Sequence, residues 1–233
     1  RRALEGADFV VNAIQVGGYD PATKIDFELP ARYGLKQTIG DTLGIGGIFR
    51  GIRTLQVMFP IVREMEDASP DAVLLNYANP MAIVTGGLLK YSDVPSVGLC
   101  HSVQVCVPRL LKYVGLDIDS DIDPEEVRWH IAGINHMAWL LEISHRGKDL
   151  YPEIKRRAIE LSEHPDKLRL ELMRRFGYYV TESSEHNAEY SPYWIKSAYP
   201  QLIKQYQIPL DEYPRRCEQQ IEEWGLRRDE LVG

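Results

Sequence analysis

The chain has 233 residues and a formal net charge of −7 at pH 7, with 44% hydrophobic and 26% charged residues. This composition is typical of a globular protein, and the negative charge argues against nucleic acid as the main partner. No apolar run approaches the roughly 20 residues that a membrane span needs, so we expect no membrane partner. The length is sufficient for one large domain or two modest ones.

The first half of the chain alternates apolar runs with helical patterns. The apolar runs predict short buried strands, at residues 7–14, 71–77 and 94–99. The helical patterns lie between and after them, at residues 46–67, 80–91 and 102–115. This alternation is the pattern of a Rossmann-like, doubly wound parallel sheet. The segment Gly44-Ile45-Gly46-Gly47 opens the longest helix and is interpreted as a site of close backbone packing, because no complete phosphate-loop motif accompanies it.

The acidic stretch from Asp117 to Glu126 predicts the boundary between two domains. We expect the Rossmann-like domain to occupy residues 1–120 and a second, mostly helical α+β domain to occupy residues 121–233. The second domain contains two predicted strands, at residues 127–134 and 139–144. Its predicted helices follow, at residues 151–163, 166–176, 198–206 and 214–230. The chain opens with Arg1 rather than Met, so we expect an internal fragment from which the N-terminal part of the sheet is missing.

Polar residues follow each of the three predicted strands. Gln15 follows the first, Asn79 the second, and Cys100 with His101 the third. In open parallel sheets, ligands bind beyond the carboxyl ends of the strands. We therefore expect these residues to face one crevice.

Cys100 and His136, each next to the end of a predicted strand, form a candidate metal site. Taken alone, a cysteine is often a small buried apolar residue and a histidine a hydrogen-bonded core residue. A thiolate with an imidazole favours zinc, iron or cobalt before manganese by ligand type alone. Two protein ligands leave coordination positions for a substrate, which is typical of a catalytic site.

Two other features of the sequence bear on the site. Cysteine is sparse and odd in number, which fits a reducing cytoplasm better than a disulfide framework. Cys106 and Cys217 fall within helical patterns and are interpreted as packing residues. The segment from Glu182 to Tyr190 is dense in titratable groups and is either a solvated loop or a wall of the pocket that supplies a base.

Four motifs in this order resemble glycoside hydrolase family 4, and within it the bacterial α-galactosidase branch. They are Asn76-Tyr77-Ala78-Asn79-Pro80, Gly98-Leu99-Cys100-His101-Ser102, Ala132-Gly133-Ile134-Asn135-His136 and Thr181-Glu182-Ser183-Ser184-Glu185-His186. The resemblance extends over essentially the whole chain. It implies hydrolysis of a small-molecule α-galactoside with NAD, a divalent transition metal (usually Mn²⁺) and reducing conditions.

The reaction that the resemblance implies is a redox-assisted elimination. NAD⁺ takes hydride from C3 of the sugar, and the resulting ketone acidifies the proton on C2. The metal polarises that ketone as a Lewis acid. A base removes the C2 proton, the glycosidic oxygen leaves with help from an acid, water adds to C1, and the hydride returns to C3.

The resemblance also implies roles for individual residues. Cys100 and His136 match the metal ligands of the family. Asn79 matches a substrate-binding residue near the nicotinamide, so Asn79 and Gln15 are our candidates for cofactor contacts. His101 stands where members acting on 6-phosphoglycosides carry Asp, which supports a non-phosphorylated substrate and makes His101 the candidate acid.

The candidate base is Tyr190, because the family uses a tyrosine of the second domain; Tyr193 is close to it in sequence. Family members open with a strand and a Gly-rich turn that hold the NAD pyrophosphate, and they continue beyond the position of Gly233. We therefore expect the main NAD contacts to lie outside this chain and the isolated fragment to expose sheet edge and lack activity.

Three alternative functions remain open at the level of sequence. The first is another sugar specificity within the family, that of an α-glucosidase or an α-galacturonidase. The second is an NAD-dependent dehydrogenase, since the Asn79-Pro80 strand end resembles that of the lactate and malate dehydrogenases; Cys100 and His136 argue against it, because those enzymes use no metal. The third is a degenerate binding module. The resemblance further suggests a homo-oligomer.

Overall fold

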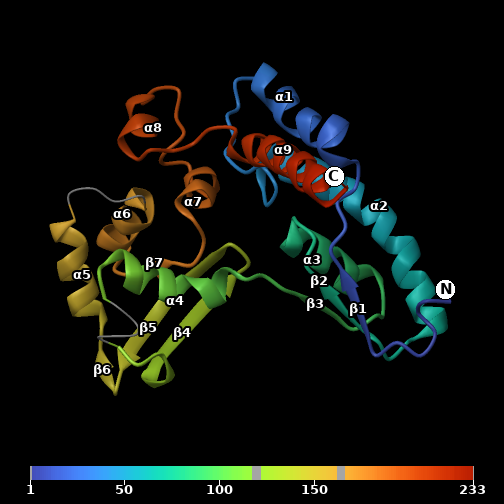
Figure 1. The fold of residues 1–233 in the computed structure, drawn as a ribbon, viewed down its shortest axis with the longest axis horizontal. Helices are drawn as coiled ribbons and strands as arrows, with labels where there is room; N and C mark the ends of the chain where they lie inside the picture. The colour runs from blue at the N-terminus through green and yellow to red at the C-terminus, as the bar shows by residue number, and fades with distance from the viewer. Residues whose placement is uncertain (1, 117–121, 162–165, 233) are drawn as a thin grey trace. The chain divides into compact units, whose positions relative to one another are not determined.

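The computed structural model of this protein describes residues 2–116, 122–161 and 166–232 (Figure 1). Contacts among these residues divide the chain into two compact units. The first contains the residues up to Leu99 together with those from Pro209 onward, and the second runs from Cys100 to Ile208. Each unit has its own sheet and its own apolar core.

The first unit is built on a parallel sheet of three strands. These are β1 (Phe9–Asn12), β2 (Val73–Asn76) and β3 (Ser96–Gly98), which lie side by side in this order. The connections are helical: α1 (Lys24–Arg32) and α2 (Gly44–Ala68) follow β1, and α3 (Met81–Tyr91) follows β2. The prediction of a Rossmann-like parallel sheet is therefore confirmed, with strands shorter than their apolar runs.

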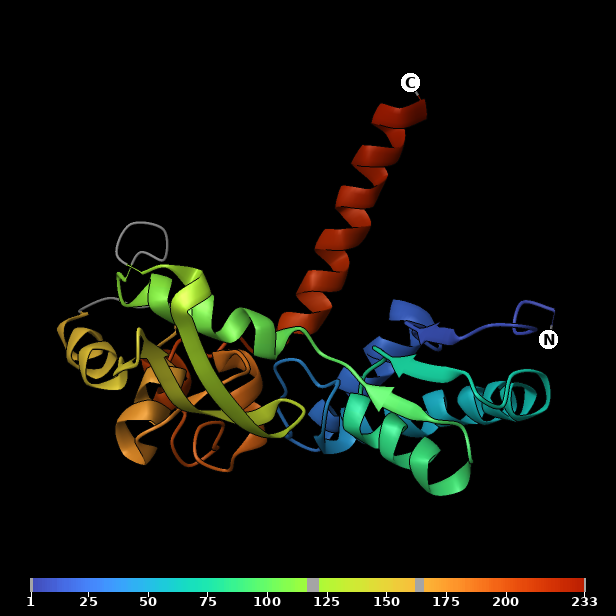
Figure 2. The same ribbon diagram turned by 90° about the horizontal axis from the view of Figure 1, so that it is seen from below.

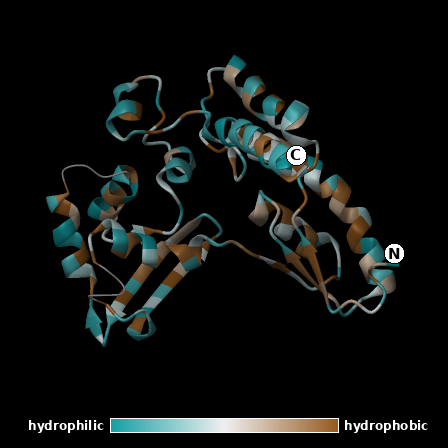
Figure 3. Cartoon of the chain, viewed as in Figure 1, coloured by the Kyte–Doolittle hydropathy of each residue, from teal (hydrophilic) through white to brown (hydrophobic). Residues whose placement is uncertain are grey.

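The core of the first unit lies between α2, α3 and the middle strand. Met58, Val62 and Met65 of α2 are buried against Leu74 of β2, together with residues of α3. Figure 3 shows these elements as largely apolar. By length and composition alone α2 is long and apolar enough to cross a membrane. Its buried face identifies it instead as a core helix, which passes the same test.

Two glycines at the start of α2 permit close approach of the backbone. A Cβ at Gly46 would lie 2.8 Å from the carbonyl oxygen of Gly40, and one at Gly47 would lie 2.9 Å from the carbonyl carbon of Thr42. Real side chains do not reach such distances, so only glycine fits. The interpretation of the Gly-rich segment as a packing feature is confirmed.

The carboxyl ends of β1 and β2 are joined by side chains. The amide nitrogen of Asn12 donates to the amide oxygen of Asn76 over 2.7 Å, and both residues are buried. The chain returns to this unit at α9 (Glu212–Val232), where the Tyr213 amide donates to the carbonyl of Thr38 over 3.0 Å. Figure 2 shows α9 as a long straight helix, and its Trp224 is exposed.

The second unit is built on an antiparallel sheet centred on β5 (Met137–His145). The strand pairs with β4 (Val127–Ile134), β6 (Lys148–Asp149) and β7 (Tyr179–Val180). The helices of the unit are α4 (Ser102–Tyr113), α5 (Tyr151–Glu160), α6 (Lys167–Phe176), α7 (Ser184–Tyr190) and α8 (Gln201–Gln205). The expected mixed, mostly helical character is confirmed, although the helix predicted at residues 214–230 groups with the first unit as α9. Helix α7 was not predicted from the sequence.

Helix α4 packs into the core of this second unit. Its Cys106, Leu110 and Leu111 are buried in one cluster with Leu140 of β5 and Ile154 of α5. The helix therefore groups with the second unit by its contacts, whereas the sequence analysis placed it in the first domain. The predicted boundary between residues 120 and 121 lies outside the described residues and stays a prediction.

The remaining cysteines occupy the places that their helical patterns predicted. Cys106 lies inside α4 and is 1% exposed, while Cys217 lies inside α9 and is 9% exposed. Their interpretation as packing residues is confirmed.

Replacement of Leu140 by Ala should destabilise the second unit, because the side chain is fully buried at the centre of its core. We expect a loss of about 2–5 kcal/mol in the free energy of unfolding. Urea denaturation followed by tryptophan fluorescence would measure it. Ile159→Ala, at a position 80% exposed in the same unit, is the control and should change little; equal effects of the two substitutions would contradict the assignment of the core.

Candidate active site

A tight hairpin turn presents His136. Strands β4 and β5 are paired through Ile134 and Met137, so only Asn135 and His136 form the loop. The backbone of His136 has φ 61°, in the left-handed region that non-glycine residues seldom adopt. Such a conformation costs on the order of 1 kcal/mol and is found preferentially at functional sites.

The thiol of Cys100 lies against the imidazole of His136. The distance from Cys100 Sγ to His136 Nε2 is 3.4 Å. Cys100 precedes α4, and Ser102 at the start of that helix lies 3.4 Å from the sulfur through its hydroxyl. The structure thus brings together the two residues that the sequence analysis proposed as metal ligands, although 35 residues separate them in the chain.

Tyr190 contacts the other nitrogen of the same imidazole. Its hydroxyl lies 3.0 Å from His136 Nδ1, and the two rings are stacked with an interplanar angle of 12°. Tyr190 is the last residue of α7, a helix whose His186, Asn187 and Ala188 are buried. The segment therefore lies against the candidate metal-binding histidine, and its interpretation as a solvated loop is wrong.

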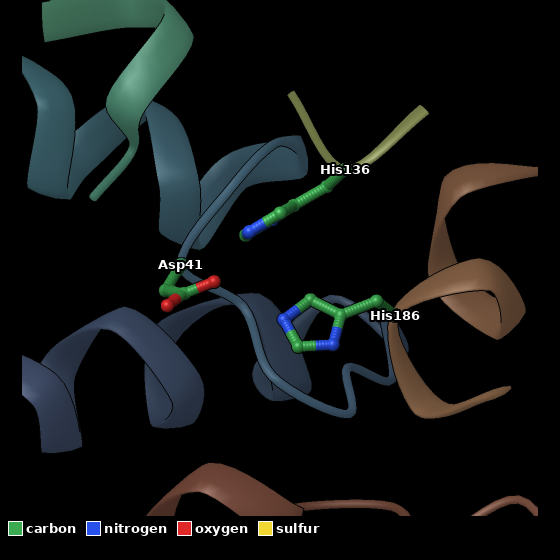
Figure 4. A group of neighbouring side chains, drawn as sticks. All are labelled: Asp41, His136 and His186. Atoms are coloured by element: carbon green, nitrogen blue, oxygen red, sulfur yellow. The ribbon is translucent and has the colours of Figure 1, made fainter. Parts of the chain in front are cut away.

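Glu182 and His186 complete the group of polar side chains around His136. One carboxylate oxygen of Glu182 lies 3.4 Å from His136 Nε2, and the other lies 3.5 Å from His186 Nδ1. The rings of His136 and His186 have centroids 4.8 Å apart. Figure 4 shows these two side chains together with Asp41, a residue of the first unit. Ser183 caps α7 and also contacts His186 Nδ1, at 2.7 Å.

The geometry of Cys100 and His136 fits a metal ion. Sulfur and nitrogen ligands bind a divalent metal at about 2.3 and 2.0–2.1 Å, so two ligands of one ion lie about 3–4 Å apart. The sulfur-to-nitrogen distance of 3.4 Å meets this condition. The ligand atoms of Cys100, His136 and Glu182 all lie within 4.8 Å of one another.

Comparison with known proteins places this fold and site in a family. The family described as Family 4 glycosyl hydrolase matches residues 1–116, and its C-terminal domain matches residues 131–229. The chain belongs to glycoside hydrolase family 4. An α-galactosidase of Bacillus subtilis is 60% identical over 99% of this family 4 chain and 52% of its own length. The chain therefore spans about half the length of this relative.

Solved structures agree with this family 4 assignment. The structure of lplD from Bacillus subtilis is 26% identical and has a TM-score of 0.84, covering 99% of this chain and 56% of that one. A 6-phospho-α-glucosidase from gut microorganisms, solved with NAD and Mn²⁺, is 21% identical with a TM-score of 0.65 over 95% of this chain and 53% of its own. The fold is thus that of the family.

Neighbouring side chains lower the pKa of two acidic groups at this family 4 site, Cys100 and Glu182. Burial raises the pKa of the Cys100 thiol, but hydrogen bonds from His136 and Ser102 outweigh burial and leave it below its ordinary value. Burial likewise opposes ionisation of Glu182, while the charges of His186 and His136 bring the pKa of its carboxyl below the usual range. Both groups therefore ionise at a lower pH than usual, and the ionised form is the one that binds metals.

The other predicted site residues are held in different surroundings. The side chain of His101 is exposed at the beginning of α4. In the first unit, the side-chain nitrogen of Asn79 donates to Asp41 over 2.9 Å. Gln15 donates to the hydroxyl of Thr23 over 3.2 Å. Their proposed roles in this family 4 chain stay predictions.

Glu182 and His186 were not singled out from the sequence, although both stand in the motif that carries the family 4 resemblance. The local sequence nevertheless contains a signal for the start of the helix that carries His186. Ser183 precedes His186 by three residues, which is the spacing of a serine that caps a helix through the third following amide. The structure contains this contact, from the His186 amide to Ser183 Oγ at 3.4 Å.

Cys100 should be the first thiol to react with iodoacetamide in the metal-free protein. Its lowered pKa gives more thiolate at a given pH, whereas burial raises the pKa of Cys106 to about 11 and also raises that of Cys217. Alkylation at pH 7–9, read by peptide mass spectrometry, would measure the order. In His136→Ala the pH midpoint of Cys100 alkylation should move upward; an unchanged midpoint would contradict the role of the imidazole.

Proposed function

We propose that the protein hydrolyses α-galactosides with the help of NAD and a divalent metal ion, usually Mn²⁺, and that Cys100 and His136 hold the metal. The observation that carries the proposal is the 3.4 Å approach of Cys100 Sγ to His136 Nε2 in a chain of family 4. These residues come from different elements, and a lone packing cysteine would not need an imidazole facing its sulfur.

The comparisons support the substrate and the cofactors. Identity of 60% to an α-galactosidase favours a galactoside, with α-glucosidase and α-galacturonidase as alternatives within the family. A protein of the same fold has been solved with both NAD and Mn²⁺. His101, where phosphoglycoside-specific members carry Asp, supports a substrate without phosphate. A metal-independent dehydrogenase would leave the pairing of Cys100 with His136 unexplained.

When bound, NAD accepts a hydride from the sugar and the metal polarises the neighbouring carbonyl. The residues of this chain provide the surroundings for that chemistry. To bind a metal, His136 would present the lone pair of Nε2, and its proton would then reside on Nδ1. In that form Nδ1–H would donate to the oxygen of Tyr190, 3.0 Å away. This places our candidate base one hydrogen bond from the metal-binding imidazole.

The remaining roles are assigned to residues outside this cluster. His101, next to Cys100 in sequence and exposed, is the proposed acid for the departing glycosidic oxygen. Asn79 is proposed to bind the substrate and, with Gln15, the cofactor. A metal-binding thiol must stay reduced, which supports a cytoplasmic location. We further propose that the protein acts as a homo-oligomer on small-molecule glycosides, without a nucleic-acid or membrane partner.

Hydrolysis of p-nitrophenyl α-galactoside by the full-length protein tests this proposal. Activity should require Mn²⁺, NAD⁺ and a thiol together, and omission of any one after removal of bound cofactor should abolish it. Parallel assays with the α-glucoside and the α-galacturonide test the sugar. Activity that persists without NAD⁺ would overturn the mechanism, and hydrolysis of the galacturonide alone would replace the galactoside as substrate.

Replacement of Tyr190 by Phe should lower kcat by about 10²–10⁴-fold, the usual contribution of a general base. The hydroxyl of Tyr190 lies at Nδ1 of His136, the ring nitrogen that is not the proposed metal ligand. Its removal should therefore lower the affinity for Mn²⁺ by no more than about 10–100-fold. Steady-state kinetics and Mn²⁺ titration would separate the two effects. Tyr193→Phe is the matched control, and a larger loss of kcat in that variant would transfer the role of base to Tyr193.

A further inference from the structure

We propose that Glu182 is a third protein ligand of the metal ion, so that the site is a Cys100–His136–Glu182 centre. This inference rests on the proposed function, because it takes Cys100 and His136 as ligands of the same ion. It goes further by assigning a carboxylate to the metal.

The carboxylate approaches the metal-binding nitrogen of His136. Glu182 Oε2 lies 3.4 Å from His136 Nε2, the atom that also lies 3.4 Å from Cys100 Sγ. An N–H···O hydrogen bond is normally 2.7–3.2 Å long, with the strong charge-assisted bonds at about 2.7–2.9 Å. A separation of 3.4 Å is longer than these, but it is the separation of two atoms that share one divalent ion.

The ring nitrogen that Glu182 approaches shows whether the carboxylate would bind the metal itself or only orient the histidine that binds it. A carboxylate that merely orients a metal-binding histidine accepts a hydrogen bond from the ring nitrogen that does not bind the metal. In this site that nitrogen, Nδ1 of His136, is contacted by the hydroxyl of Tyr190. Glu182 lies instead at Nε2, on the side of the ring that faces the thiol of Cys100.

The second oxygen of the carboxylate is held by the protein. Glu182 Oε1 accepts a hydrogen bond from the backbone amide of Ser183 over 2.9 Å. The same oxygen lies 3.5 Å from His186 Nδ1, and the side chain of Glu182 is only 13% exposed. One oxygen is therefore anchored while the other is directed at His136, which is the arrangement of a carboxylate that binds a metal through a single oxygen.

The backbone before Glu182 is anchored independently of the site. The Thr181 amide donates to the carbonyl of Ala138 over 3.0 Å, which ties this segment to β5 two residues after His136. The guanidinium of Arg169, itself 3% exposed, donates to the carbonyl oxygens of Val180 and Thr181 over 2.8 and 3.1 Å. These contacts between protein atoms place Glu182 beside His136.

A carboxylate ligand changes which metal the site prefers. A thiolate with an imidazole suits zinc, iron or cobalt, whereas oxygen ligands suit manganese and magnesium. Addition of the Glu182 oxygen to Cys100 and His136 moves the set toward Mn²⁺. A thiolate and a carboxylate together also match the charge of a divalent ion, which reduces the cost of burying it.

Metal binding by the full-length Glu182→Gln variant, without NAD⁺ or substrate, tests the proposal. Two probes are used: Mn²⁺ titration by calorimetry, and the absorption spectrum of the Co²⁺-loaded protein. Loss of a direct ligand should weaken Mn²⁺ binding by more than about 100-fold, beyond the effect of removing an outer partner. It should also alter the d–d bands of Co²⁺, while the thiolate-to-cobalt charge-transfer band from Cys100 persists. Glu182→Asp, which retains the charge on a shorter side chain, should give intermediate Mn²⁺ affinity.

Glu185→Gln, a neighbour at the start of α7 outside the metal cluster, is the matched control and should bind both ions as the parent does. Far-ultraviolet circular dichroism of each metal-free variant checks that it folds, and the Asp variant replaces the Gln variant if the latter does not. If the d–d bands of Co²⁺ were unchanged in Glu182→Gln, Glu182 would not be a ligand, even if Mn²⁺ binding were weakened. The Cys100–His136 pair would not be affected by that result. Absence of a thiolate-to-cobalt band in the parent, or its persistence in Cys100→Ser, would overturn the proposed metal pair as well.

Discussion

Strand β5 is the element on which the second unit depends. It is hydrogen-bonded to three other strands, and it contributes Leu140 and Ile143, both almost fully buried, to the core. Its first residue directly follows His136, and its Ala138 carbonyl accepts hydrogen bonds from Thr181, next to Glu182. The same strand therefore supports the core and fixes the distance between two members of the polar cluster.

Much of the fold follows from apolar periodicity. The runs around β1, β2 and β3 predicted a parallel sheet because they are short, rich in branched residues and separated by helical patterns. The paired strands are shorter than the runs: β2 covers only Val73–Asn76 of the predicted strand at residues 71–77. The grouping of α4 was not predictable: the apolar positions of Cys106 and Leu110 indicate a buried helical face, but they do not say which sheet that face covers.

The part of the candidate site that lies in recognisable motifs and strand ends was predictable from the sequence. Cys100 and His136 were expected together, and they lie in contact. Glu182 and His186 were not singled out, because a segment rich in acids, serines and histidines is usually solvated. In the structure the chain before this segment is held by Arg169, whose guanidinium donates hydrogen bonds to the carbonyls of Val180 and Thr181. Such a contribution depends on tertiary contacts, and local patterns do not contain it.

The division of the chain into two units has a consequence for the order of folding. The second unit is continuous from Cys100 to Ile208, whereas the first needs segments from both ends of the chain. As the polypeptide leaves the ribosome, every residue of the second unit is available before α9 has been synthesised. The first unit must therefore remain incomplete during that interval. The contacts that complete it join residues up to Leu99 with residues from Pro209 onward, more than a hundred positions apart, and contacts of such long range are slow to form.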